Sequence, residues 1–164
     1  MKLKAALTIL IFITLNLKVD ADFKDGLDAY KTGDYSTAFK EWLPLANQGY
    51  ADAQANIAGM YLSGLGVTKD DEEAIRWYSR AAIQGFTRAQ YILGTMYENG
   101  EGVSSDFPEA LKWYIMAAEQ EDHQAQFHLG YIYAYGLAVP KDYAKGIKWT
   151  TLAAKNKNVK AQQL

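Results

Sequence analysis

A period of 36 residues runs through most of the chain and restricts its fold more than any other feature. Tyrosine, glycine, valine, tryptophan and alanine each recur at this spacing. The clearest registers are an alanine followed by glutamine, at Ala53-Gln54, Ala89-Gln90, Ala125-Gln126 and Ala161-Gln162, and an aspartate, at Asp34, Asp70, Asp106 and Asp142. Repetition of this kind indicates stacked copies of one supersecondary unit, because a single unit cannot bury its own apolar face.

Each unit has the pattern of two helices. The apolar positions of the first helix follow i, i+4, i+8 spacing, at Ala53, Ile57 and Tyr61. Gly64 is expected to end this helix, since glycine adopts left-handed backbone angles at little cost. Asp70 and Glu73 then fit a capping box that opens the second helix, and Gly85 follows its last turn. The recurring Trp-Tyr pairs in the second helices are interpreted as core packing rather than as an aromatic ligand box.

The predicted fold is therefore all-α, an alpha-alpha superhelix built as a solenoid of antiparallel helix pairs. The period divides the chain into a signal peptide at 1–21, an N-terminal unit at 22–50, repeats at 51–86, 87–122 and 123–158, and a partial repeat or cap at 159–164. A natural short cap and a truncated reading frame are both consistent with this last segment.

The first 21 residues have the composition of a cleavable secretory signal. Lys2 and Lys4 precede an apolar run from Ala5 to Leu15, and small residues suit cleavage after Ala21. The run is shorter than the roughly 20 apolar residues that span a bilayer, which argues against a membrane anchor. We therefore expect a periplasmic or secreted protein with no membrane span in its mature chain.

Several chemistries are excluded or disfavoured by composition. Cysteine is absent, which removes disulfides, thiolate nucleophiles, cysteine-ligated zinc and an acylated cysteine anchor. His123 and His128 stand five residues apart and so lie on different faces of a helix, a poor arrangement for one metal ion. No serine stands in a nucleophile-elbow pattern. We expect no catalytic residues, no metal and no cofactor.

Charge is distributed unevenly along the mature chain. Loss of the leader changes the net charge from −2 to −4, with acidic residues dominating the body. The basic end holds Lys141, Lys145, Lys148, Lys155, Lys157 and Lys160. These lysines are interpreted as a solvated helix face, a patch for an acidic partner or anionic polymer, or a nucleic-acid surface. The acidic total argues against nucleic acid, and head-to-tail association stays open.

The repeated motifs resemble those of the Sel-one-like repeat family, a branch of the tetratricopeptide superfamily. The matching segments are ADAQANIAGMYLSGLGVTKDDEEAIRWYSRAAIQG, RAQYILGTMYENGEGVSSDFPEALKWYIMAAEQ and QAQFHLGYIYAYGLAVPKDYAKGIKWTTLAAK. The preceding stretch, LDAYKTGDYSTAFKEWLPLANQG, looks like a tetratricopeptide unit with a shorter turn. The resemblance implies a protein-interaction scaffold, often extracytoplasmic in bacteria. Some cysteine-rich members are associated with penicillin binding or beta-lactam hydrolysis, and the absence of cysteine argues against that activity here.

A partner is expected on the concave face, which the first helices line in a solenoid of this kind. Positions opposite the apolar stripe change from small and polar to aromatic along the chain. The candidate partner-binding residues are Asn56, Arg88, Ile92, Thr95, Asn99, His128, Tyr131 and Tyr135. An alternative places Tyr131 and Tyr135 in the packing under the partial fourth unit. The predicted function is partner binding without catalysis; the alternative is an envelope enzyme or accessory factor acting on peptidoglycan or beta-lactams.

Overall fold

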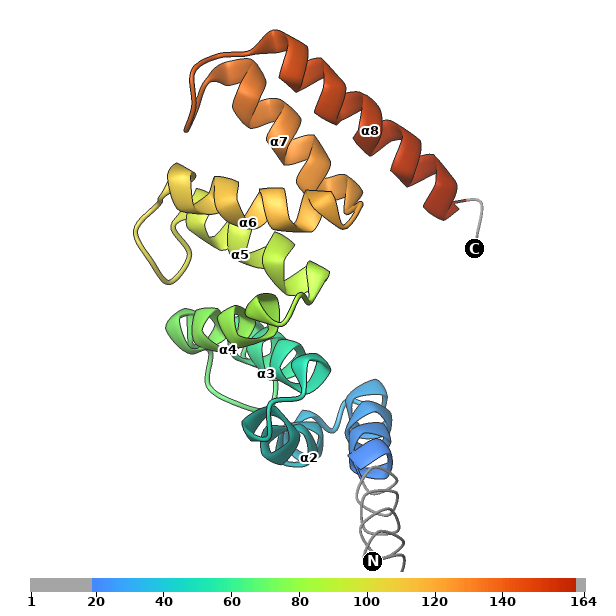
Figure 1. Ribbon diagram of the computed structural model, residues 1–164. Coiled ribbons are helices and arrows are strands. Elements are labelled where there is room, and N and C mark those ends of the chain that lie inside the picture. The colour runs from blue at the N-terminus through green and yellow to red at the C-terminus, as the bar shows by residue number, and fades with distance from the viewer. Residues whose placement is uncertain (1–18, 162–164) are drawn as a thin grey trace, which may run out of the picture.

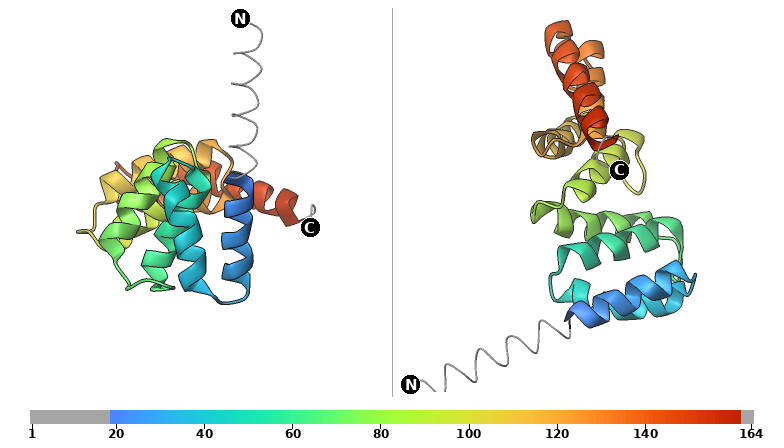
Figure 2. Two further views of the ribbon diagram at one scale, coloured as in Figure 1. Left: turned by 90° about the horizontal axis from the view of Figure 1, so that it is seen from below. Right: turned by 90° about the vertical axis from the view of Figure 1, so that its right-hand side faces the viewer.

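The computed structural model describes residues 19–161, and over that range it consists of helices without strands. A helix described over residues 19–31 is followed by α2 (Tyr35–Asn47), α3 (Ala51–Ser63), α4 (Asp71–Ile83), α5 (Thr87–Asn99), α6 (Phe107–Glu119), α7 (His123–Tyr135) and α8 (Tyr143–Ala161). Successive helices pack as antiparallel pairs that are stacked in chain order (Figure 1, Figure 2). The prediction of an all-α repeat solenoid is confirmed.

Residues 1–18, which hold most of the predicted signal peptide, lie outside the described residues, as do residues 162–164. The predicted cleavage site after Ala21 falls within the described part of the first helix. In the described part of the chain, no helix has the length and apolar character that a membrane crossing requires.

Glycine ends the first helix of each repeat, as the sequence predicts. Gly64 follows α3 with φ of 67°, Gly100 follows α5 with φ of 74°, and Gly136 follows α7 with φ of 71°. Each donates its backbone N–H to a carbonyl in the last turn of the helix it ends. These left-handed angles turn the chain toward the second helix of the unit.

Aspartate caps the second helices, but the capping box is only half formed. The side chain of Asp70 accepts a hydrogen bond from the Glu73 amide at 3.0 Å, and the same bond recurs in the next two units. The prediction of a return bond from the Asp70 amide to the Glu73 carboxylate is wrong. The Glu73 carboxylate pairs with Arg76 instead. The Asp70 amide donates to the Tyr61 carbonyl at 3.0 Å, so a contact across the loop has taken the place of the local one.

The second glycine of each loop lets neighbouring units approach closely. A Cβ at Gly66 would lie 2.4 Å from the carbonyl oxygen of Tyr35, at the start of α2. A Cβ at Gly102 would lie 2.7 Å from the carbonyl carbon of Asp71, at the start of α4. The loop after each first helix therefore lies against the second helix of the preceding unit.

The recurring glutamine joins three successive helices. Gln54 is buried, donates through Nε2 to the carbonyl of Ala46 at 3.0 Å, and accepts from Nε2 of Gln84 at 2.8 Å. Gln90 and Gln126 repeat both bonds one and two units later. Burial of an amide is tolerated here because both of its ends are hydrogen-bonded.

The buried residues form two clusters rather than one central core. One cluster spans α2 to α5 and the other lies mainly between α6 and α7. Trp77, Tyr78 and Tyr114 are buried in these clusters, which supports the interpretation of the Trp-Tyr pairs as packing residues. Gly94 lies against the Tyr114 ring, where no larger residue fits without movement.

α8 differs from the other second helices in its length. α4 and α6 have 13 residues, whereas α8 has 19. Gly49, Gly85 and Glu121 take positive φ after α2, α4 and α6, and these angles turn the chain into the next unit. Lys157 occupies the equivalent position and lies inside α8. Residues 159–161, where the register places the start of a partial fourth unit, thus continue α8.

Candidate partner-binding site

Three of the eight candidate residues meet in one groove near the N-terminal end. Asn56 of α3 with Arg88 and Ile92 of α5 contribute to a groove of about 530 Å³. Its other lining residues are Leu27, Tyr30, Trp42, Ala55, Gly59, Met60, Leu62, Ser63, Tyr78 and Phe86. We call this the N-terminal groove. Its lining comes mainly from the helix at 19–31, α3 and the start of α5, with Trp42 from α2 and Tyr78 from α4.

The N-terminal groove combines an apolar lining with one guanidinium group. Arg88 is exposed, and it forms no ion pair with any other described side chain. Burial raises the pKa of the Tyr78 hydroxyl to about 12, although the nearby charge of Arg88 acts in the opposite direction. Tyr78 is therefore a neutral hydrogen-bonding group, and Arg88 is the cation that a bound partner would meet.

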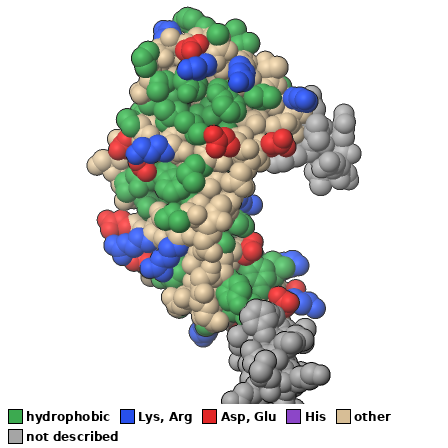
Figure 3. All heavy atoms as spheres, viewed as in Figure 1, with side chains coloured by type: hydrophobic (Ala, Val, Ile, Leu, Met, Phe, Trp, Pro, Cys, Tyr) green, Lys and Arg blue, Asp and Glu red, His purple; other side chains and the backbone are tan. Residues whose placement is uncertain are grey.

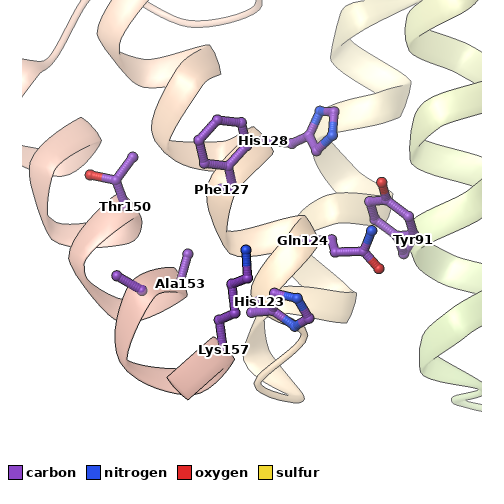
Figure 4. A pocket seen from close by; sticks show the side chains of 9 residues that line it. Tyr91, His123, Gln124, Phe127, His128, Thr150, Ala153 and Lys157 are labelled. Atoms are coloured by element: carbon purple, nitrogen blue, oxygen red, sulfur yellow. The ribbon is translucent and has the colours of Figure 1, made fainter. Parts of the chain in front are cut away.

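A second groove lies at the other end of the solenoid, between α7 and α8. It has a volume of about 560 Å³ and includes His128, another candidate residue. Figure 4 shows its side chains, with Tyr91 from α5 on one side and Thr150, Ala153 and Lys157 of α8 on the other. We call this the C-terminal groove.

His128 is held by its neighbours within the protein. Its Nδ1 lies 3.0 Å from Oε2 of Glu98, which also accepts a hydrogen bond from the Tyr114 hydroxyl at 2.5 Å. The imidazole stacks on the Tyr114 ring at 4.8 Å between centroids. Burial, followed by the hydrogen bond to Glu98, raises the pKa of Tyr114 above its ordinary value. This cluster joins α5, α6 and α7, so His128 has a structural role besides facing the groove.

The remaining candidates are dispersed. Tyr131 and Tyr135 line a third, smaller groove of about 200 Å³, and their rings lie 4.5 Å apart. Thr95 and Asn99 line none of these grooves, and their side chains bond locally to the Ile92 carbonyl and to Glu101. The eight residues therefore do not form one continuous site.

Sequence reasoning missed the part of the N-terminal groove that lies outside the periodic segments. Leu27 and Tyr30 come from the helix at 19–31, and Trp42 comes from α2. Phe86, the residue before α5, also lines the groove. The only signal for Leu27, Tyr30 and Trp42 was the tetratricopeptide-like pattern of the N-terminal unit, which predicts a stacked helix pair but no particular lining residue.

The lysine-rich end is partly engaged with its own residues. Lys145 lies 3.6 Å from Asp142 and over the ring of Tyr133. Lys141 lies over the ring of Tyr143, and Lys157 lines the C-terminal groove. The side chain of Lys160 lies outside the described residues. Exposed pairs of this kind contribute little to stability, so these charges remain accessible to a partner.

Comparison with protein families matches the Sel1 repeat to residues 51–86, 87–122 and 123–158, more than half of the chain. The chain belongs to the Sel1 repeat family. A Sel1 repeat protein from Oxalobacter formigenes is 38% identical, with a TM-score of 0.76 over 82% of this chain and 54% of that one. The protective antigen c5321 of uropathogenic Escherichia coli, which displays the same fold, is 33% identical, with a TM-score of 0.81 over 91% of this chain and 33% of that one.

One curated relative shares a shorter segment. An exopolysaccharide production negative regulator of Rhizobium leguminosarum bv. viciae is 40% identical over 60 residues, which are 37% of this chain and 22% of the regulator. The chain thus spans only part of the length of each of these relatives. Sel1 repeats generally mediate protein interactions, which agrees with the grooves described above.

Proposed function

We propose that this Sel1 repeat protein is a secreted or periplasmic scaffold that binds a protein or peptide partner in the N-terminal groove, without catalysing a reaction. The observation that carries the proposal is the groove itself. It is concave, it is lined by apolar and aromatic side chains from successive repeats, and it contains Arg88, which forms no ion pair with any other side chain that the structure describes. Such a surface suits an extended segment with apolar residues and one carboxylate.

Replacement of Arg88 and Ile92 tests the groove directly. The mature protein is used as bait on the envelope fraction of the native cell, in parallel with an Arg88→Glu/Ile92→Asp variant. We expect the partner recovered by the wild type to fall at least tenfold with the variant. Arg76→Glu is the matched control, because Arg76 is an exposed arginine on α4, outside the groove. Equal recovery by both variants and the wild type would exclude the groove as the binding site.

The localisation and the absence of catalysis need separate tests. N-terminal sequencing of the protein from fractionated cells should give a chain that begins at Asp22 in the periplasm or the medium. A full-length N-terminus in the cytoplasm would contradict the proposed export. Incubation of the purified protein with beta-lactam and peptidoglycan substrates should show no turnover above background, and turnover that Arg88→Glu leaves unchanged would support the enzyme alternative.

A further inference from the structure

The last helix pair, α7 and α8, has an apolar side that no described residue covers. We call it the end surface and define it by Phe127, Tyr131, Tyr135, Tyr143, Ile147 and Ala154, all of which are exposed. Figure 3 shows hydrophobic side chains over the upper part of the molecule, where α7 and α8 lie. Exposed apolar patches of this kind indicate interaction sites in soluble proteins.

The positions of the end surface that lie on α8 are less exposed in the two preceding repeats. Ile147 is 67% exposed, whereas Ile75, two periods earlier, is 8% exposed. Ala154 is exposed, whereas Ala82 and Ala118 are buried. In those repeats α5 packs on α4 and α7 packs on α6, so the first helix of the next unit lies on this side. The end surface is therefore the place where a fourth first helix would lie.

The described chain does not place a helix there. α8 continues through Lys157 instead of turning back as the chain does after α4 and α6. The C-terminal groove and the smaller groove beside Tyr135 share Phe127 and Thr150, so the depression follows most of the length of the pair. Thr150 stands where positions 78 and 114 have tyrosine, and it lines both grooves.

Charge decides which occupant fits. Lys141, Lys148 and Lys157 lie along α8 or immediately before it, and each is exposed. A second copy packed end to end would bring two such lysine sets together, which is unfavourable. A helix with acidic flanks would instead complement them, and the internal precedent is a first helix of 13 residues, about 20 Å long.

We propose that the end surface binds an amphipathic α-helix of another protein, with an apolar face and acidic flanks, in the place of a fourth first helix. Partner binding at this surface is separate from binding in the N-terminal groove. The helix-in-groove mode requires apolar anchors about one turn apart, and Ile147 lines the smaller groove that would receive them.

A peptide with the sequence of one of the protein's own first helices provides the probe. A fluorescently labelled, hydrocarbon-stapled peptide carries the α5 sequence, Thr87–Asn99, with three glutamates added at each end. Fluorescence anisotropy measures its binding to the wild type, to Ile147→Glu and to Ile83→Glu. Ile83 is the matched control, because it is an exposed isoleucine on α4, at 74% exposure, outside the end surface. We expect equal affinity for the wild type and Ile83→Glu, and at least tenfold weaker binding by Ile147→Glu.

Two further measurements distinguish the other occupants. The same peptide flanked by lysines instead of glutamates should bind at least tenfold more weakly. Arg88→Glu should leave binding of the acidic peptide unchanged, whether or not it abolishes binding in the N-terminal groove. Equal binding by Ile147→Glu and the wild type would overturn the proposal, as would equal binding of the two peptides. If the wild type sediments as a dimer and Ile147→Glu as a monomer, the end surface binds a second copy of the chain, and the proposal is overturned as well. Tyr143→Glu, also at an exposed position, replaces Ile147→Glu if circular dichroism shows that the latter is unfolded.

Discussion

Gly94→Ala should destabilise the protein although alanine favours helices. A Cβ at this position of α5 would lie 2.6 Å from Cδ1 and Cε1 of Tyr114 and 3.0 Å from Cζ. Favourable contacts between carbon atoms are about 3.5–4.0 Å long, so the ring would have to move by roughly 1 Å. The ring is not free to do so, because Tyr114 is fully buried, bonds to Glu98 and stacks on His128.

The expected size follows from two opposing effects. Overpacking of a rigid core costs about 1–3 kcal/mol, whereas replacement of a helical glycine by alanine gains about 0.5–1 kcal/mol. We therefore expect a net loss of about 1–2 kcal/mol in the free energy of unfolding. Urea denaturation followed by circular dichroism at 222 nm measures it, with the slope of the transition compared between variants.

Gly59→Ala is the matched control on α3. Its Cβ would meet only the Tyr78 hydroxyl oxygen, at 3.3 Å, so the alanine should be neutral or stabilising by up to about 0.5 kcal/mol. Tyr114→Leu should also abolish the cost of Gly94→Ala, because it removes the atoms that clash. If Gly94→Ala is as stable as Gly59→Ala, the close approach of α5 and α6 does not limit this position and the reasoning fails.

Two further predictions concern buried polar groups. Gln90→Met removes the bonds to Ala82 and Gln120 and should lower the free energy of unfolding by about 1–2 kcal/mol in urea denaturation. Gln124→Met, at an exposed position on α7, should cost under about 0.5 kcal/mol, and equal costs would show that the buried amide is not special. Because the pKa of Tyr78 is raised from 10.0 to about 12 in the folded state, its neutral form stabilises the fold below pH 10 and this contribution is lost as the pH rises to 12. Between pH 10 and pH 12, the free energy of unfolding of Tyr78→Phe should therefore fall by up to about 2–3 kcal/mol less than that of the wild type. Identical profiles of unfolding free energy against pH would contradict the burial argument.

The sequence predicts the repeat, its helices and their ends because these depend on residues within one unit. Gly64 ends α3 and Asp70 caps α4, as local rules require. The prediction of a capping box is correct for the Asp70 side chain but not for the Asp70 amide. That amide donates to the Tyr61 carbonyl, a contact that closes the interhelical loop. Helix-end rules consider neighbours three or four residues away, so they do not account for a more distant hydrogen-bond acceptor such as the Tyr61 carbonyl.

The N-terminal groove could be predicted only in part. The register placed Asn56, Arg88 and Ile92 on one side of successive first helices, and they do line one groove. It also grouped Thr95 and Asn99 with them, although these two side chains bond locally and line none of the grooves described above. Periodicity identifies equivalent positions, but it does not give the curvature of the stack. That curvature decides which positions face a common cavity.

His128 shows how one register position takes different roles along the solenoid. The equivalent residues are Asn56 and Ile92, which line the N-terminal groove. His128 instead bonds to Glu98, and Glu98 itself stands where the neighbouring units have leucine and alanine. A bonded polar cluster at the junction of repeats 2 and 3 thus stands where the preceding junction has Leu62 and Ile92. Because that cluster fixes α7 against α5 and α6, it also fixes the orientation of the C-terminal groove that α7 forms with α8.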